Sequence, residues 1–328
     1  MHHSKHWLSF FALEGLDEIN ECLNSLSSHN IIRISDIHLE HGRFSLLLLS
    51  RALNTYRKSY DTPIEVYRLD FPAHNYQEMI KISNEEPESY TKLANCFTYY
   101  TSGSYMNRLH PDNSISLHIT SHLLTAVNVR EPAPDTFYPS VSMDERIRNS
   151  RKIQAVEDLT KFLQVRYEEL INDGRIYVDM IGSLPDENNF RVFLDKALFK
   201  AIELKILPEE FKTFGFRTHY WETEDLMKVV DNMRGKLELV SHKEVLVSMP
   251  QYLQYQQDND IQAYAESFVQ FWKKALEFSL KFHFKGFFTD LQLLEIISNL
   301  CNLILEEFKA APPSTRANSH YLVLKKIA

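Results

Sequence analysis

The sequence is short of glycine and of cysteine, and each shortage excludes a class of protein. Only 8 of the 328 residues are glycine, where a globular chain usually carries about 7%. A collagen-like or low-complexity chain is therefore excluded, and any nucleotide-binding loop must work with few glycines. The 3 cysteines are scattered, with no CxxC pair and no Cys/His spacing typical of zinc. We expect no metal site, and we expect a reducing compartment.

Positive charge and long hydrophobic runs are also scarce. The chain has 36 Lys and Arg against 44 Asp and Glu, so its net charge is −8, which argues against nucleic acid as a partner. The longest purely aliphatic run is Leu46–Leu49, far below the roughly 20 residues of a membrane span. The N-terminus lacks the basic and apolar regions of a signal peptide. We therefore expect a cytoplasmic protein with neither a nucleic-acid nor a membrane partner.

Strand-like runs alternate with helix-like runs along the chain. Short β-branched runs at Ile31–Asp36 and Ile64–Asp70 are each followed by a helical pattern. Further strands are predicted at residues 96–100, 116–120, 175–181, 237–247 and 321–327, and an amphipathic helix at 155–171. Strands separated by helices indicate βαβ units and a mostly parallel sheet. Two helical stretches, 184–232 and 253–309, exceed this repeat and are interpreted as a cap.

Three short motifs lie where predicted strands end. Asp36 ends the first strand and Gly42 follows before a helix, Asp70 ends the second strand, and Thr101–Tyr105 is a turn after the third. The carboxyl ends of parallel strands are where open α/β sheets bind ligands. A carboxylate there can accept hydrogen bonds from ribose hydroxyls, and an aromatic ring can stack on adenine. Each motif alone is weak, because an Asp that ends a strand is also common in turns.

In their order and spacing these motifs resemble the SABATH family, the plant salicylate-, benzoate- and caffeine-type methyltransferases. The family's DLGCSSG corresponds to Asp36–Gly42, its NDLPGNDF to Leu69–Tyr76, and its GSFYGRLFP to Gly103–Pro111. Its FLxxRxEEL and GGRM motifs are echoed by Phe162–Leu170 and Asp173–Ile176. The resemblance covers nearly the whole chain. It implies an α/β Rossmann-like methyltransferase fold, a mostly parallel seven-stranded sheet flanked by helices, with an interleaved α-helical cap.

The resemblance also implies S-adenosylmethionine (SAM) as cofactor and roles for single residues. The implied cofactor-binding residues are Asp36 and Gly42 on the methionine side, Asp70 at the ribose, and Phe71, Ser104 and Tyr105 around the adenine. The implied substrate is a small-molecule carboxylic acid, and the implied assembly is a homodimer. The chain then divides into a SAM-binding core (1–127), a connection to the cap (128–154), a core helix and strand (155–182), the helical cap (183–235), and the last strands with the C-terminal helices (236–328).

The sequence departs from the family at the cofactor loop and at the substrate clamp. His38 replaces the first glycine of the loop, and Leu39–His41 replaces its small residues. Trp7 stands where the family has a Gln that helps to hold the substrate carboxylate, and the Trp of the family's His-Trp pair is lost. The residues that we expect to bind and position the substrate are Trp7, His122, Thr125 and His219.

These departures leave two functions open. A carboxylate that is already ionised can attack a methyl group directly, so no residue is assigned as a catalytic acid or base. Correct placement and the exclusion of water then carry the catalysis. The first function is a SAM-dependent methyltransferase with an altered substrate clamp. The second is a catalytically inactive methyltransferase-like protein that serves as a binding or interaction module, which the divergent His38–His41 loop favours.

Overall fold

A computed structural model describes residues 13–37, 43–70, 76–121, 132–284 and 286–327. Its centre is a seven-stranded sheet in the order β3-β2-β1-β4-β5-β7-β6. The strands are β1 (Ile32–Ile37), β2 (Ile64–Asp70), β3 (Cys96–Ser102), β4 (Ile115–Ser121), β5 (Leu170–Ile181), β6 (Leu237–Ser248) and β7 (Arg316–Lys326). Strands β1 to β5 are parallel, and β7 runs antiparallel between β5 and β6. The mostly parallel seven-stranded sheet is thus confirmed.

The strand order reverses at β1, which lies between β2 and β4. Ile34 of β1 pairs with Val66 on one side and with Leu117 on the other. The chain passes from one half of the sheet to the other between β3 and β4, so the carboxyl ends of β1 and β4 flank the position where α/β sheets bind ligands. Both strands are almost completely buried, as parallel strands covered on two faces usually are.

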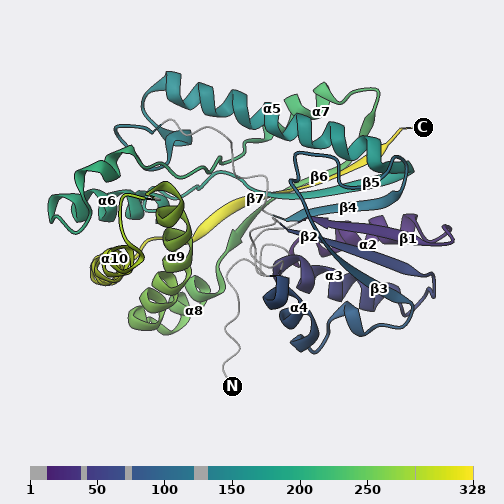
Figure 1. The fold of residues 1–328 in the computed structure, drawn as a ribbon, viewed down its shortest axis with the longest axis horizontal. Helices are drawn as coiled ribbons and strands as arrows, with labels where there is room; N and C mark the ends of the chain where they lie inside the picture. Colours follow the sequence, from purple (N-terminus) through teal and green to yellow (C-terminus); the bar gives the residue numbers. More distant parts are fainter. Residues whose placement is uncertain (1–12, 38–42, 71–75, 122–131, 285, 328) are drawn as a thin grey trace.

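Helices cover both faces of the sheet and build a separate lobe. They are α2 (Leu16–Ser25), α3 (Arg43–Tyr56), α4 (Tyr76–Glu85), α5 (Glu145–Glu169), α6 (Phe190–Glu203), α7 (Thr223–Asn232), α8 (Pro250–Asp258), α9 (Ile261–His283) and α10 (Asp290–Ala310), with short 3-10 helices η2 (Tyr90–Lys92), η4 (Pro139–Val141) and η5 (Glu209–Thr213). Figure 1 shows α2, α3 and α4 on one side of the sheet and α5 and α7 on the other. Within the described ranges, none of the helices is long and apolar enough to cross a membrane.

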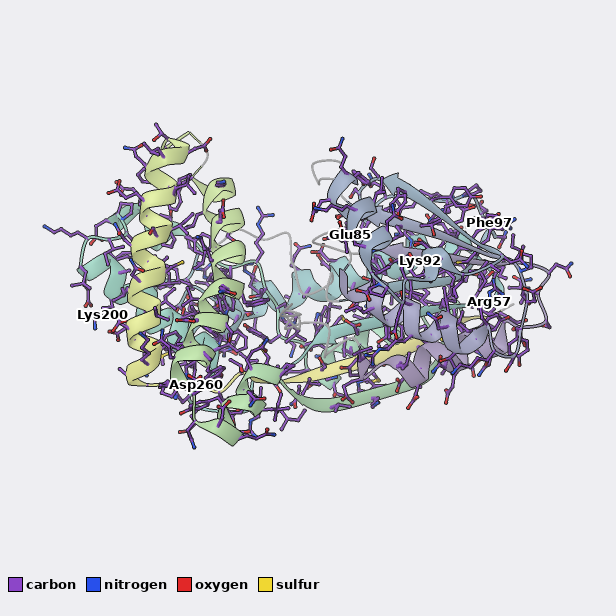
Figure 2. All side chains as sticks on the ribbon, turned by 90° about the horizontal axis from the view of Figure 1, so that it is seen from below. Arg57, Glu85, Lys92, Phe97, Lys200 and Asp260 are labelled. Atoms are coloured by element: carbon purple, nitrogen blue, oxygen red, sulfur yellow. The ribbon has the colours of Figure 1, made fainter. Side chains whose placement is uncertain are left out.

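The cap is interleaved with the sheet and has its own core. Helix α6 is inserted between β5 and β6, and α8 to α10 between β6 and β7. These helices pack around Phe268 and Leu300, both 0% exposed, beside the amino-terminal end of β7 (Figure 1). Figure 2 shows the cap, with Lys200 and Asp260, on one side of the molecule and the β3 edge, with Phe97, on the other. The expected helical cap is therefore present.

The helix expected at residues 155–171 is longer than the sequence pattern indicates. It begins at Glu145, because the side chain of Asp144 accepts hydrogen bonds from the backbone N–H groups of Arg146 and Ile147. Its early turns bury Arg151 completely. The periodicity of apolar residues does not reveal the part of a buried helix face that carries charged side chains. The predicted start of the helix was therefore too late.

The start of β5 also differs from the prediction. Leu170 directly follows α5 and already pairs with Ile115. Residues 172–174, which lie between the predicted helix and the predicted strand, form an irregularity inside β5, where Asp173 has a φ of 63°. The ammonium group of Lys326 donates a hydrogen bond to the Leu170 carbonyl at 2.7 Å. This bond from β7 satisfies a carbonyl at the end of the helix and lets the strand begin without a loop.

Candidate functional site

Four of the predicted cofactor residues lie at the carboxyl ends of adjacent strands. Asp36 is the second-last residue of β1, Asp70 is the last residue of β2, and Ser104 and Tyr105 follow β3. The N–H of Gly103 donates a hydrogen bond to the Asp70 carbonyl at 3.3 Å. The structure thus places three motifs that lie far apart in the sequence at the carboxyl ends of three adjacent strands, beside the point where the strand order reverses.

Main-chain contacts fix Asp70 at this edge. The hydroxyl of Tyr76, the first residue of α4, lies 2.6 Å from the Asp70 carbonyl oxygen and 2.9 Å from the Thr101 carbonyl oxygen. One phenol group therefore ties the ends of β2 and β3 together. Asp70 itself is only 1% exposed. The sequence comparison included Tyr76 at the end of the family motif Leu69–Tyr76 and gave it no role.

Asp36 has a buried partner that the sequence motif did not reveal. Its Oδ2 accepts hydrogen bonds from Nε of Arg68 at 3.2 Å and from the Ser45 hydroxyl at 3.0 Å. Both ionic side chains are 0% exposed. Burial raises the pKa of Asp36 to about 6, and the positive charge of Arg68 opposes that shift. Arg68 also donates to Ser83 of α4 at 2.6 Å, so the pair anchors the end of β1 to the helices beside it.

A buried arginine of α5 clamps the turn that carries Ser104 and Tyr105. The guanidinium of Arg166 donates hydrogen bonds to the carbonyl of Tyr105 at 2.9 Å and to that of Asn107 at 2.7 Å. It also forms an ion pair with Glu169, in which Nε lies 2.9 Å from Oε2. Both ionic side chains are 0% exposed. The planar guanidinium can meet the carboxylate and two carbonyls at once, and therefore fixes the shape of the turn.

Glu169 collects further donors from the same turn. Its Oε1 accepts hydrogen bonds from the N–H of Leu109 at 2.6 Å and of His110 at 3.1 Å. Its Oε2 lies 3.3 Å from Nε2 of His118 on β4. The His110 ring in turn lies 2.9 Å from the Ser35 hydroxyl of β1. Sequence reasoning matched the arginine and glutamate of α5 to a family motif and gave them no role, although their i,i+3 spacing is a signal of pairing.

His219 lies beyond the carboxyl end of β4. Ser121, the last residue of β4, pairs with Asp179 of β5. Three residues further along the chain from Asp179, Gly182 pairs with Trp221 instead. On its other side Gly182 donates to the Asn318 carbonyl of β7 at 2.7 Å. The segment that contains Trp221 therefore lies next to β5 beyond the carboxyl end of β4 and extends the sheet there. The His219 ring stands edge-on to the Trp221 indole, with centroids 4.9 Å apart.

The imidazole of His219 is buried and neutral. It is 5% exposed, and among the described residues neither of its ring nitrogens has a hydrogen-bond partner. Burial lowers the pKa of His219 to about 4, Asp225 opposes the shift, and Lys152 and Arg151 add to it. A neutral imidazole can donate one hydrogen bond and accept another. A buried polar group without a hydrogen-bond partner costs about 1–3 kcal/mol. Such a side chain is therefore well suited to bind a ligand that supplies the missing hydrogen bond.

Comparison with known proteins decides the family. Residues 14–326 match the model of the SAM dependent carboxyl methyltransferases. The chain belongs to this family. The match covers nearly the whole chain and confirms the resemblance given by the strand-end motifs. It also gives SAM as the family's cofactor.

Individual relatives are distant in sequence, and one solved structure shares the fold. The salicylate/benzoate carboxyl methyltransferase of Arabidopsis thaliana is 25% identical over 49% of this chain and 46% of the relative. The jasmonate O-methyltransferase of the same plant is 25% identical over 66% of each chain. The chain spans about half the length of several of the curated relatives that it matches. A solved loganic acid methyltransferase with SAH superposes with a TM-score of 0.72 over 98% of this chain and 94% of its own, at 18% identity.

Five predicted site residues of this carboxyl methyltransferase family member lie outside the described residues. They are Trp7, Gly42, Phe71, His122 and Thr125. The divergent loop at residues 38–41 is also outside them. These residues stay predictions. In the part of the chain that the structure describes, no three His, Cys, Asp or Glu side chains are grouped so that they could hold a metal ion.

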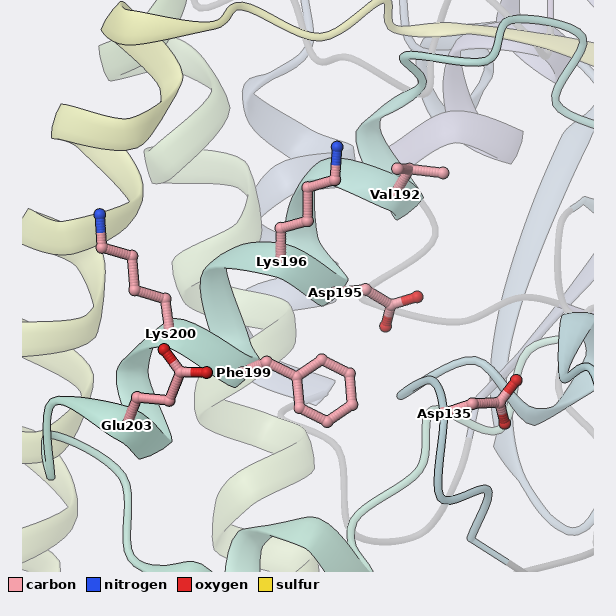
Figure 3. A pocket seen from close by; sticks show the side chains of 7 residues that line it. All are labelled: Asp135, Val192, Asp195, Lys196, Phe199, Lys200 and Glu203. Atoms are coloured by element: carbon pink, nitrogen blue, oxygen red, sulfur yellow. The ribbon is translucent and has the colours of Figure 1, made fainter.

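A surface pocket of about 450 Å³ lies in the cap, away from the strand ends. Figure 3 shows it beside α6, with Phe199 between the carboxylates of Asp135 and Asp195 on one side and Glu203 on the other. Two of its acidic groups already have partners: Asp195 accepts hydrogen bonds from the Thr136 hydroxyl at 2.6 Å and from the Phe137 N–H at 2.8 Å, and Asp135 accepts one from the Ser142 hydroxyl at 2.6 Å. The bonds to Asp195 hold the connection before α5 against α6, so the pocket belongs to the framework of the cap.

The buried imidazoles should make the free energy of unfolding depend on pH. Burial lowers the pKa of His110 and of His219 to about 4, while an unfolded histidine titrates near 6.5. The unfolded chain therefore binds these protons first as the pH falls. Stability should be complete above about pH 6.5 and should fall between pH 6.5 and pH 4, by about 3 kcal/mol for each imidazole.

Urea unfolding at pH 7.0 and pH 4.5 measures this loss. The variants His219→Gln and His110→Gln should each show a smaller difference between the two pH values than the wild type. The variant His29→Gln, at a partly exposed site, is the matched control and should leave the difference unchanged. Equal pH dependence in all four proteins would contradict the assignment of buried neutral rings.

Proposed function

We propose that the protein transfers a methyl group from SAM to the carboxylate of a small organic acid. One observation carries the proposal: in a chain of the SAM-dependent carboxyl methyltransferase family, Asp36, Asp70 and the turn with Ser104 and Tyr105 lie at the carboxyl ends of the adjacent strands β1, β2 and β3, beside the point where the strand order reverses. Small-molecule acids as substrates are supported by the relatives, which are named for salicylate, benzoate and jasmonate.

The described residues fit the cofactor. We assign the ribose hydroxyls to the Asp70 carboxylate and the adenine to Ser104 and Tyr105, with Asp36 anchoring the methionine side. The turn is tightly packed, because a Cβ on Gly103 would lie 2.9 Å from Cδ2 of Leu109 and the Leu109 side chain would have to shift. When bound, SAM supplies a methyl group on a sulfonium, an electrophile that an ionised carboxylate can attack without a general base.

The protein's own contribution is placement. We propose that His219 donates a hydrogen bond to the substrate from its place beyond β4, since its ring is neutral and buried and has no partner among the described residues. A carboxylic acid with a pKa near 4 is ionised at neutral pH, so the site must orient it and exclude water rather than remove a proton. A neutral donor suits this task, because it holds the carboxylate oxygen without neutralising it.

We also propose that the protein is a cytoplasmic homodimer. Its three cysteines, Cys22, Cys96 and Cys301, are free thiols, which supports a reducing compartment. The dimer is carried over from the family resemblance. Sedimentation velocity at micromolar protein should give a single species of about twice the 38.5 kDa chain mass, and a monomer over the whole concentration range would contradict the dimer.

A binding test followed by a turnover test decides the function. S-adenosylhomocysteine (SAH), the demethylated product, at a hundred times its dissociation constant should stabilise the fold by about 2.7 kcal/mol, which raises the melting temperature by several degrees. Labelled SAM should then methylate an acid in a panel of salicylate, benzoate, jasmonate and loganic acid analogues. No shift at millimolar SAH would contradict cofactor binding. A shift without turnover on any acid would favour an inactive binding module.

A further inference from the structure

His320 of β7 reaches across Gly182 to the segment of residues 216–222, here called the Trp221 segment. Its Nε2 lies 3.0 Å from the Trp221 carbonyl oxygen, and its side chain is 1% exposed. A Cβ on Gly182 would lie 2.6 Å from that nitrogen and 2.9 Å from the neighbouring ring carbon. Atoms that are not bonded do not approach so closely, and a residue with a side chain at position 182 would therefore displace the imidazole.

This bond holds Trp221 from a second direction. The N–H of Trp221 donates to the Ile181 carbonyl at 3.1 Å, while its own carbonyl accepts the bond from His320. Both polar groups of one peptide residue are thus tied to the sheet just beyond the end of β5. His219 lies two residues earlier and packs edge-on against the indole. The place of His219 relative to the end of β4 consequently depends on this anchor.

The orientation of the His320 ring is fixed on the side away from Trp221 by a contact with β6. A carbonyl oxygen only accepts hydrogen bonds, so Nε2 of His320 must donate, and Nδ1 of the neutral ring is then an acceptor. Nε2 of His242 on β6 lies 3.1 Å from that Nδ1, and the two rings stack with centroids 5.4 Å apart at 17°. Oε2 of Glu244 lies 4.0 Å from the same nitrogen. His242 of β6 therefore aims the imidazole at the Trp221 segment.

We propose that His320 is a positioning residue of the methyl transfer, which acts through Trp221 to hold His219 over the carboxyl end of β4. The proposal rests on the function proposed above. A buried position on a central strand is usually occupied by an apolar side chain. His320 instead makes a directed hydrogen bond, and Gly182 leaves room for its ring. We explain both by the need to hold the Trp221 segment at a defined distance from the sheet.

The experiment compares His320→Phe, His320→Gln and Gly182→Ala with Val323→Ala. Val323 is a buried residue of the same strand and packs in the core under α2 and α3, so its variant controls for lost stability. We expect His320→Phe and Gly182→Ala to lower kcat/KM for the acid about tenfold or more, chiefly through KM, with the SAH dissociation constant within about twofold of wild type. His320→Gln keeps an N–H donor and should recover part of the loss.

Hydrogen exchange at the Trp221 amide gives a second readout that needs no turnover. Loss of the anchor in His320→Phe and Gly182→Ala should speed this exchange about tenfold or more, and Val323→Ala should not. Unchanged exchange with unchanged kcat/KM would overturn the proposal, and so would a parallel loss of SAH binding, which indicates a general structural role. If the wild type binds SAH and methylates no acid, the proposed function fails, while the exchange result still decides whether the anchor exists.

Discussion

Replacing Asp70 with alanine should weaken SAH binding about a hundredfold or more. The reason is that a ribose offers two hydroxyls to one carboxylate, and hydrogen bonds to a charged group contribute about 1.5–3 kcal/mol each. The fold should survive the change. The bonds that Asp70 makes to the Tyr76 hydroxyl and to the Gly103 N–H use its carbonyl oxygen, which alanine keeps. Calorimetric titration with SAH measures the affinity, and thermal unfolding without ligand measures the fold.

Two further variants separate the ribose assignment from a general loss of the site. Asp70→Asn keeps one acceptor oxygen in the same place and should lose about tenfold in affinity. Asp61→Ala removes an exposed carboxylate from the loop before β2 and should bind SAH as the wild type does. If Asp70→Ala binds SAH with unchanged affinity, the ribose assignment is wrong, and family membership is unaffected.

The sequence predicted the strands and their carboxyl ends well because those features are local. The run at Ile64–Asp70 is β2 to the residue, since β-branched residues and the Asp-Phe-Pro sequence mark both ends. Once the parallel strands are placed, their carboxyl ends must meet at one edge, and the three cofactor motifs meet with them. This is why Asp70 and Tyr105 could be placed at the carboxyl ends of β2 and β3 without any knowledge of the fold's interior.

The contacts that hold the site were not predictable, because each joins residues that are distant in the sequence. Arg68 pairs with Asp36 across two strands, and His320 reaches Trp221 over Gly182. Charges that are buried in pairs do not follow an apolar period, so a pattern of hydrophobic residues cannot show them. The same reason shortened the predicted α5, whose buried face carries several charged side chains. Sequence reasoning found the groups that we assign to the ligand and missed those that hold them.

Glu169→Gln should lower the free energy of unfolding by about 3–5 kcal/mol, because it leaves the guanidinium of Arg166 buried without its carboxylate. The amide also cannot accept all the donors that now converge on Glu169, which include the N–H groups of Leu109 and His110. Chemical denaturation measures the loss, and the melting temperature should fall by roughly 10 °C. The neighbouring variant Glu168→Gln, at an exposed position, is the control and should stay within about 0.5 kcal/mol of wild type.

The double variant Arg166→Met with Glu169→Gln separates buried charge from the shape of the cofactor turn. Removing both charges leaves no uncompensated ion, so the double variant should be more stable than Glu169→Gln alone. It should still bind SAH more weakly than the wild type, because no guanidinium then holds the carbonyls of Tyr105 and Asn107. Recovered stability with fully recovered binding would contradict the clamp. Recovered stability with weak binding would show that the pair of Arg166 and Glu169 shapes the turn, because uncharged residues could then replace its contribution to stability.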